Sequence, residues 1–450
     1  MPRLTPLAAL FSLSLLVNAA AADWPGFRGL NGDGVSVDKD IPVKWAKDNF
    51  LWKTKLPGPG SASPIVWGDK VFVVCYGGYG LTLTKGNPLD KGKDPPGKGF
   101  PPKAKDASGD QKKLKRYVLC LDAAKGNVLW EQEVAPKLPE QAFVQMIREH
   151  GYASNTPVTD GERLYVFFGK TGVLAFDFTG KKLWTADVGT GLYVYGSASS
   201  PVLYKDLVIV NASAESKALV AVDKTNGKVV WRNKSITTTW SSPVMVKTKD
   251  GQDELVLSQP NKVAGYDPLT GKELWKCDGL PVPTGGSSYC TPVSKEGVLY
   301  LAGGAGPGST ATAFAVKSGG RGDVSKSHVL WRVKAGSTIN SPVISGDFLH
   351  IVESTATCLR LDTGKQVYKQ RFFDSGMEYA SPVLCGDKIY QVTRFDGIYI
   401  MSAGGKFQSL GHNAFQGDYS SFNASPAVSD GRMFVRSDTH LYCIGKKAGP

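Results

Sequence analysis

Apolar residues along this chain occur in short runs separated by turns that are rich in Gly, Asp and Lys. Within residues 200–231, for example, the apolar runs Leu207–Val210, Leu219–Val222 and Val229–Trp231 follow one another closely. Few windows keep the 3.6-residue apolar period of a helix, and beyond the N-terminal segment only Leu138–His150 is predicted to be helical. The pattern therefore predicts an all-β chain of short strands.

A Ser/Thr-Pro step recurs eight times along the chain, and each step is followed by an apolar run. Apart from the first interval, the prolines lie 40 to 50 residues apart, which matches one four-stranded propeller blade. The first interval of 93 residues also holds two expected insertions, a basic one at about 79–116 and a short helical one at about 138–150. We therefore predict a single domain, 23–450, folded as an eight-bladed β-propeller of four-stranded antiparallel blades. The steps are Ser63-Pro64, Thr156-Pro157, Ser200-Pro201, Ser242-Pro243, Thr291-Pro292, Ser341-Pro342, Ser381-Pro382 and Ser425-Pro426.

The outer end of the repeat carries an aromatic residue, whose area and rigidity suit it to fill the gap between twisted sheets. The last unit stops after its third strand, at Leu441–Gly445, whereas Phe50–Thr54 resembles a fourth strand without its blade. Pairing of these two segments is predicted to close the ring and to remove an exposed edge. The expected blade-docking residues are Trp52, Trp130, Trp184, Trp231, Trp275, Trp331 and Tyr368.

The repeat Asp-x-x-Thr-Gly-Lys-x-x-Trp, seen at Asp267–Trp275, resembles that of pyrroloquinoline-quinone (PQQ)-type propellers. This group comprises quinoprotein dehydrogenases and cofactor-free relatives such as the outer-membrane assembly factor BamB. The resemblance covers Asp23 to Gly445, and the opening Trp24–Gly29 is similar to secreted members found in planctomycete-type bacteria. It implies the propeller fold but says little about activity, because the repeated residues lie on the outer hairpins.

The N-terminus is predicted to be a signal peptide, residues 1–22. Arg3 precedes the short apolar run Leu7–Val17, and the alanines 19–22 provide small residues for cleavage. No Cys follows the apolar run, so a lipoprotein is not expected, and no later stretch is long and apolar enough to span a membrane. We expect a monomer exported to the periplasm or the extracellular space.

Nearly half of the formal net charge of +13 lies between Lys85 and Arg116, which hold ten Lys/Arg against four Asp/Glu. Such a segment, interrupted by Pro pairs and Gly, is predicted to be a flexible surface loop that is either merely solvated, the favoured interpretation, or in contact with an acidic polysaccharide or anionic lipid. Nucleic acid is not an expected partner, because no aromatic residues are interleaved with the charges. The seven cysteines have no Cys-x-x-Cys spacing, and most are interpreted as small core residues, with one or two disulfides possible.

The segments that precede the Ser/Thr-Pro steps are expected to reach the central channel. They carry Ser, Asn, Tyr and Trp, which suit hydrogen bonding and stacking against a polar or planar ligand. The alternative is that small side chains simply allow eight strands to converge on a narrow axis. If a ligand binds, stacking is expected from Trp240 and the tyrosines and hydrogen bonding from the others. The candidate ligand-binding residues are His150, Tyr152, Trp240, Tyr289, Asn340, Glu378 and Tyr379.

Catalytic chemistry has less support in the sequence. Calcium takes six to eight oxygen ligands, several of them carboxylates, but Glu149 and Glu378 are the main acidic residues of the channel segments. The adjacent-cysteine disulfide of the quinoprotein family is absent, His150 has no evident Ser partner, and the five histidines lack zinc-site spacing. We therefore predict a non-catalytic scaffold without metal or cofactor that binds a ligand, a protein or a glycan in the cell envelope. The alternatives are a PQQ- and calcium-dependent oxidoreductase with Glu149 or Glu378 as base, and a glycan-binding envelope protein.

Overall fold

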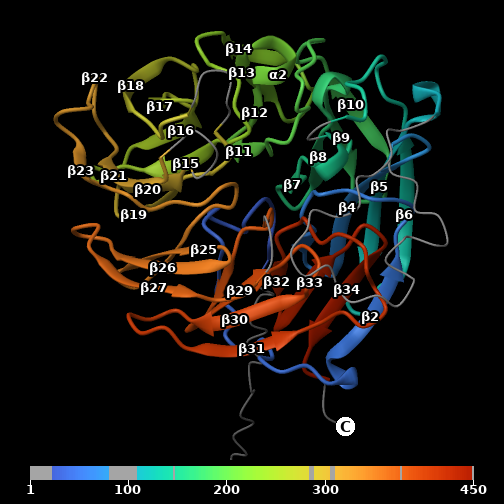
Figure 1. Ribbon diagram of the computed structural model, residues 1–450. Coiled ribbons are helices and arrows are strands. Elements are labelled where there is room, and N and C mark those ends of the chain that lie inside the picture. Colours follow the sequence, from blue (N-terminus) through green and yellow to red (C-terminus); the bar gives the residue numbers. More distant parts are fainter. Residues whose placement is uncertain are drawn as a thin grey trace, which may run out of the picture.

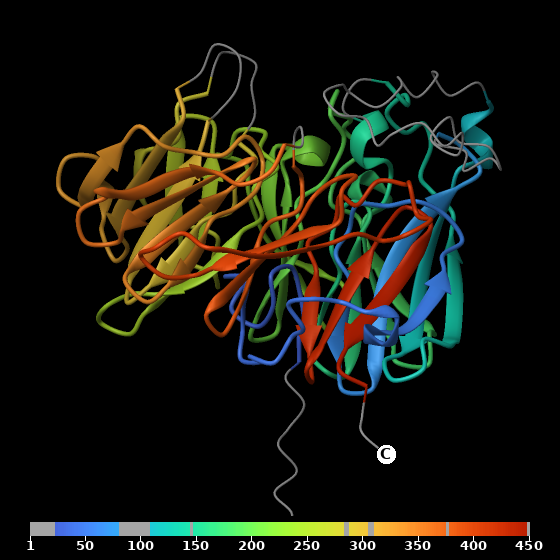
Figure 2. The same cartoon turned by 60° about the horizontal axis from the view of Figure 1, so that its bottom comes forward.

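The computed structural model describes residues 23–80, 109–144, 147–282, 288–304, 310–374 and 378–447. These residues form eight sheets, each built on four antiparallel strands, that are arranged radially around an axis (Figures 1 and 2). The predicted eight-bladed propeller is confirmed. Residues 1–22 and 81–108 lie outside the described part, so the expected signal peptide and most of the expected basic insertion lie there too.

Each of the first four blades is built from the axis outward as the chain proceeds. Their strands are β3 (Ile65–Trp67), β4 (Lys70–Gly77), β5 (Lys115–Asp122) and β6 (Val128–Val134); β7 (Val158–Thr159), β8 (Arg163–Phe167), β9 (Val173–Asp177) and β10 (Lys182–Ala186); β11 (Val202–Tyr204), β12 (Leu207–Ala212), β13 (Ala218–Asp223) and β14 (Val229–Asn233); and β15 (Val244–Lys247), β16 (Asp253–Gln259), β17 (Lys262–Tyr266) and β18 (Glu273–Asp278).

The last four blades continue the ring in the same order. Their strands are β19 (Val293–Lys295), β20 (Val298–Gly303), β21 (Thr312–Lys317) and β23 (Val329–Val333); β24 (Val343–Ser345), β25 (Phe348–Val352), β26 (Thr355–Arg360) and β27 (Gln366–Arg371); β28 (Val383–Cys385), β29 (Lys388–Val392), β30 (Ile398–Ser402) and β31 (Ser409–Asn413); and β32 (Ala427–Ser429), β33 (Arg432–Arg436), β34 (His440–Gly445) and β2 (Phe50–Lys55).

The ring closes as predicted, because β2 pairs antiparallel with β34 and supplies the outer strand of blade 8 (Figure 1). Two further short strands extend other blades. β1 (Val35–Ser36) pairs parallel with β28, the innermost strand of blade 7, and β22 (Gly322–Asp323) pairs parallel with the outer strand β18 of blade 4. The N-terminal part of the chain thus contacts both the axis and the rim.

The blades pack face to face through apolar strands. Strand β12 is buried along its whole length: Leu207 and Ile209 join residues of β16 and β17 in an apolar cluster between blades 3 and 4, and Val208 and Val210 join the cluster between blades 2 and 3. The aromatic residue of an outer strand is buried or half-buried, whereas the residues on either side of it in β14 are exposed. Each outer strand also has a register shift beside this position, so an extra residue re-aims the aromatic side chain toward the neighbouring blade.

Most of the tryptophans predicted to dock the blades donate Nε1–H to a backbone oxygen of the next blade. Trp184, for example, bonds the carbonyl of Lys224 at 3.2 Å and packs on Gly227. Trp275 is an exception, because its Nε1 bonds the carboxylate of Glu254 within its own blade at 2.7 Å. Tyr368 instead contacts His350 and Phe407. The residues that bond the next blade are Trp52, Trp130, Trp184, Trp231 and Trp331.

Two local predictions were wrong in extent. The expected helix Leu138–His150 is helical only at α1 (Ile147–His150) among its described residues; a second short helix, α2 (Ser213–Ser216), was not predicted. Lys115 and Arg116, assigned to the basic insertion, begin strand β5, since their backbone pairs with β4. Short 3₁₀ turns occur at Lys47–Asn49, Gln111–Lys113 and Gly169–Thr171.

All seven cysteines are buried and free, so the core interpretation holds and neither of the two possible disulfides is formed. In the part of the chain that the structure describes, no helix is long and apolar enough to cross a membrane.

Candidate functional site

A pocket of about 750 Å³, partly open to solvent, lies on the propeller axis and is lined by residues from all eight blades. Its lining follows a simple rule. In each step, the Ser or Thr directly before the proline lines the pocket, and so does the residue three positions before the proline. The residue two positions before the proline does not. Alternation of side chains along an extended backbone explains this selection. The residues three before the prolines are Ser61, Ser154, Ala198, Trp240, Tyr289, Ile339, Tyr379 and Asn423.

The Ser and Thr residues of the eight steps form a belt of hydroxyl groups around the pocket. From blade 1 to blade 7, the backbone N–H of this residue donates to the hydroxyl of its counterpart in the next blade, as Ser200 does to Ser242 at 2.9 Å. Seven such bonds, of 2.8 to 3.2 Å, run in succession from Ser63 to Ser425. The repeated hydroxyl therefore has a structural role, because it satisfies a buried N–H that no sheet partner reaches.

Aromatic side chains from neighbouring blades form one wall of the pocket. The Trp240 ring lies 5.1 Å from the ring of His150 and 5.3 Å from that of Tyr289, both edge to face. Its Nε1–H donates to the carbonyl of Gly196 at 3.0 Å, which fixes the ring. Burial raises the pKa of Tyr289 to about 12, so its phenol keeps its proton at neutral pH.

His150 is a neutral member of this wall. Burial lowers its pKa to about 4. Its Nε2 donates to the carbonyl of Tyr195 at 2.8 Å, and its Nδ1 lies 2.5 Å from the hydroxyl of Ser154. The sequence-based view that His150 has no Ser partner was wrong, because one turn of helix and a tight bend bring Ser154 back to it.

Tyr379 lies across the pocket on blade 7 and is held in place by an arginine. The Arg394 guanidinium packs 4.9 Å from the Tyr379 ring and forms an ion pair with Glu149. The backbone carbonyl of Glu149 in turn accepts a hydrogen bond from Asn423 at 2.6 Å. These contacts join the segment after blade 1 to blades 7 and 8 behind the pocket.

The N-terminal segment forms part of the pocket wall through Phe27. Figure 1 shows this segment as a blue loop in the middle of the ring. Trp24 pairs with Val66 of blade 1, and the buried Arg28 donates to the carbonyls of Ser341 and Pro342 on blade 6, at 3.1 and 2.6 Å. The sequence predicted no role in the pocket for Trp24–Gly29. The repeat pattern could not have indicated such a role, because this segment lies outside the repeats.

Three of the seven candidate residues do not line this pocket. Asn340 lies two before its proline and faces the blade, where its Nδ2 donates to the carbonyl of Val352 at 2.6 Å. Glu378, four before its proline, is buried and accepts the Arg394 N–H at 2.8 Å; burial raises its pKa to about 8. Tyr152 lines a separate pocket. His150, Trp240, Tyr289 and Tyr379 are brought together.

The lining does not fit a calcium–quinone centre. It contains no Asp, Glu, Lys or Arg, whereas calcium binds carboxylates and a quinone that carries carboxylates needs cationic partners. Across the part of the chain that the structure describes, no three His, Cys, Asp or Glu side chains are grouped as metal ligands. The two proposed bases, Glu149 and Glu378, are committed to Arg394.

The fold and the axial pocket define a ring-closed, eight-bladed repeat propeller. A family model described as "Outer membrane protein assembly factor BamB" matches residues 114–370, more than half of the chain. The chain belongs to this family of PQQ-like propellers. No curated protein matches the sequence.

Solved structures share the fold at low sequence identity. BamB from Moraxella catarrhalis has a TM-score of 0.56 at 13% identity, over 89% of this chain and 98% of that one. The quinohemoprotein alcohol dehydrogenase ADHIIG from Pseudomonas putida HK5 has a TM-score of 0.58 at 11% identity, over 95% and 81%. The computationally designed Ika8 protein has 0.52 at 11%, over 87% and 98%. At such identities the likeness concerns the fold alone.

Proposed function

We propose that this protein is an exported, non-catalytic propeller of the cell envelope that binds a small neutral saccharide in its axial pocket. The observation that carries the proposal is the composition of the lining. Hydroxyl groups surround the axis, aromatic rings form the wall, and no charged side chain contributes.

A neutral ligand follows from the absence of charged groups in this lining, since a charge buried there without a partner would be strongly disfavoured. A saccharide is favoured because the pocket offers both flat apolar faces and hydrogen-bonding groups. Trp240, Tyr289 and Tyr379 offer flat apolar faces against which the C–H face of a pyranose ring packs. The Tyr hydroxyls and Asn423 offer donors and acceptors for the sugar hydroxyls around its edge.

Binding without catalysis is supported by the state of the ionisable groups. Efficient general bases have a pKa near the working pH, whereas burial lowers that of His150 to about 4. Its Nε2 also contacts a backbone carbonyl rather than a carboxylate. Glu378 does not line the pocket, and its carboxylate already accepts the Arg394 N–H.

Export and an envelope location are part of the proposal. They are supported by the signal-peptide pattern of residues 1–22 and by membership of a family described as an outer-membrane assembly factor. The same description favours a protein partner in the envelope, which the rim of the ring would contact while the pocket holds its ligand.

The proposal is tested by titrating residues 23–450 with neutral mono- and disaccharides and following heat and Trp fluorescence. Because Trp240 has the largest ring system among the lining residues, Trp240→Ala is expected to weaken binding by roughly tenfold or more, about 1.4 kcal/mol. Tyr419→Ala removes an exposed tyrosine outside the pocket and serves as the control. Failure of every saccharide to bind, or unchanged affinity in Trp240→Ala, would contradict the proposal.

The quinoprotein alternative is tested on the same protein with pyrroloquinoline quinone, with and without calcium. Because the lining lacks carboxylates and cations, we expect no quenching of Trp fluorescence and no rise in melting temperature. A tight complex would raise the unfolding free energy by about 2.7 kcal/mol at a hundredfold excess over Kd. A calcium-dependent rise of that kind would revive the oxidoreductase.

A further inference from the structure

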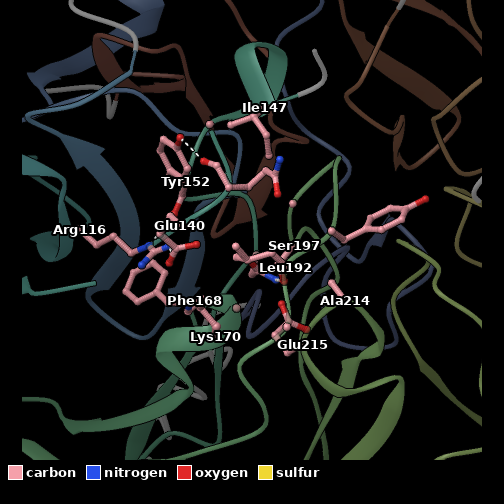
Figure 3. A pocket seen from close by; sticks show the side chains of 17 residues that line it. Arg116, Glu140, Ile147, Tyr152, Phe168, Lys170, Leu192, Ser197, Ala214 and Glu215 are labelled. Carbon is pink, nitrogen blue, oxygen red and sulfur yellow. Dashed lines mark hydrogen bonds and ion pairs between the residues drawn. The ribbon is translucent and has the colours of Figure 1, made fainter. Parts of the chain in front are cut away.

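A second, narrower pocket lies between blades 1, 2 and 3, and Figure 3 shows the side chains that line it. It is lined by strand β5, by the segments on either side of helix α1, by the turn Gly169–Thr171, by the loop that follows β10 and by helix α2. Leu192, 44% exposed, contributes to its lining at the surface, so the pocket is reached from solvent. The apolar side chains of Ile147 and Phe168 provide a further part of the wall.

The cationic side chains of this pocket already have partners. The Arg116 guanidinium forms a buried ion pair with Glu140 at 2.8 Å and also donates to the carbonyl of Tyr152 at 2.8 Å and to the hydroxyl of Thr171 at 2.9 Å. The Lys170 ammonium donates to the carbonyl of Pro139 at 2.6 Å. The charges of Arg116 and Glu140 balance each other, and both arginine and glutamate are held by well-directed contacts.

Glu215 differs from these residues. Its side chain lines the pocket from helix α2, and the residue is 5% exposed. Its Oε2 is buried without a hydrogen-bond partner, and the cationic side chains of the lining, Arg116 and Lys170, bond Glu140 and the Pro139 carbonyl instead. Ser197 provides a hydrogen bond to the carboxylate, and the Glu215 carbonyl accepts the Gly191 N–H at 2.8 Å, which ties α2 to the facing loop.

A buried carboxylate oxygen without a partner is costly, so the pocket has one unmet requirement, a hydrogen-bond donor with a positive charge. We propose that this pocket binds a primary ammonium group through Glu215, with the attached alkyl chain packed against Phe168 and Leu192. The proposal does not depend on the ligand of the axial pocket. The ammonium group belongs either to a free alkylamine or to a lysine side chain of a partner protein.

The protonation of Glu215 predicts that the affinity for an ammonium ion depends on pH in the unmodified protein. Burial raises its pKa to about 7, with a smaller opposing effect from Ser197. Arg116, Glu140 and Lys170 are the other charged groups of the lining, and the nearby His150, with a pKa of about 4, stays neutral between pH 6 and 8. An ammonium ion binds the ionised carboxylate, so affinity should rise by roughly tenfold from pH 6 to pH 8.

The test is calorimetric titration of the mature protein with butylammonium chloride at pH 6 and pH 8, with butanol and sodium butyrate as neutral and anionic analogues. We expect binding of butylammonium only, tighter at the higher pH, and weakened at least tenfold in Glu215→Gln. Glu353→Gln is the matched control, because Glu353 is also a carboxyl whose pKa is raised by burial but lies on blade 6, outside the pocket. That control should bind as the unmodified protein does.

Equal binding of butanol and butylammonium, equal affinity at both pH values, or full affinity in Glu215→Gln would each overturn the proposal. The pH comparison needs no variant, so the proposal stays testable if Glu215→Gln does not fold. A parallel titration with Nα-acetyl-lysine methylamide identifies the source. Tighter binding of this compound than of butylammonium supports a lysine of a partner protein, and weaker binding supports a free amine.

Discussion

The belt of hydroxyl groups around the axis can be tested at Ser200 with two substitutions of nearly the same shape. Ser200 accepts the backbone N–H of Thr156 at 3.0 Å, and both residues are buried. Ser200→Thr keeps the hydroxyl, and Ser200→Val replaces it with a methyl group. Threonine occupies the equivalent position in blades 2 and 5, so a branched side chain is accommodated there.

The two variants differ in one acceptor. In Ser200→Val the Thr156 N–H is left buried without a partner, which costs about 1–3 kcal/mol. We therefore expect the valine variant to be less stable than the threonine variant by about that amount in urea unfolding followed by Trp fluorescence. The comparison holds if both variants have the same m value, because an altered m would indicate a change in cooperativity. A difference below about 0.5 kcal/mol, which is within the range of neutral substitutions, would refute the structural role of the belt.

Two further predictions concern blade docking and pH. A Cβ at Gly227, which has a φ of +74°, would lie 2.6 Å from the Trp184 ring, whereas one at Gly431, with a φ of +67°, would meet nothing within 4 Å. Gly227→Ala should therefore lower the free energy of unfolding by about 1–3 kcal/mol more than Gly431→Ala in the same assay. Equal losses of stability would contradict the close packing. Burial raises the pKa of Glu378 to about 8, so the folded state binds more protons than the unfolded one between the ordinary glutamate pKa and pH 8, and stability should fall as the pH rises through that window. Glu378→Gln should flatten this part of the pH profile, and an unchanged slope would show that Glu378 does not titrate there.

The fold was predictable because its determinants repeat. Eight Ser/Thr-Pro steps give the number of blades, and the Leu-Trp segment before the first step identifies the strand that closes the ring. The errors fall where repetition stops. Helix formation at Leu138–His150 was inferred from one window without a second copy, and the tertiary contacts of that segment hold most of its described residues in a non-helical path. Propensity in a single window is easily overridden in this way.

The candidate site was predicted at the level of segments but only partly at the level of residues. Trp240, Tyr289 and Tyr379 lie three positions before their prolines and line the pocket. Asn340, two positions before its proline, and Glu378, four positions before its own, do not line it. Side chains alternate between two faces along an extended backbone, so the sequence alone could have distinguished the residues that line the pocket from those that do not. The contribution of Phe27 was not available, because it depends on how a non-repeated segment crosses the axis.

The two positions of each step that line the pocket differ in how much they vary between blades. The position before each proline is Ser or Thr in every blade, as a hydrogen-bonded belt requires. The position three before it varies from Ala198 to Trp240, although both face the same pocket. The first position is the same in kind in all blades, whereas the second is aromatic only in blades 4, 5 and 7, so ring closure does not require an aromatic there. The proposed saccharide binding therefore depends on these large rings, at a position where blades 1, 2 and 3 carry only Ser or Ala.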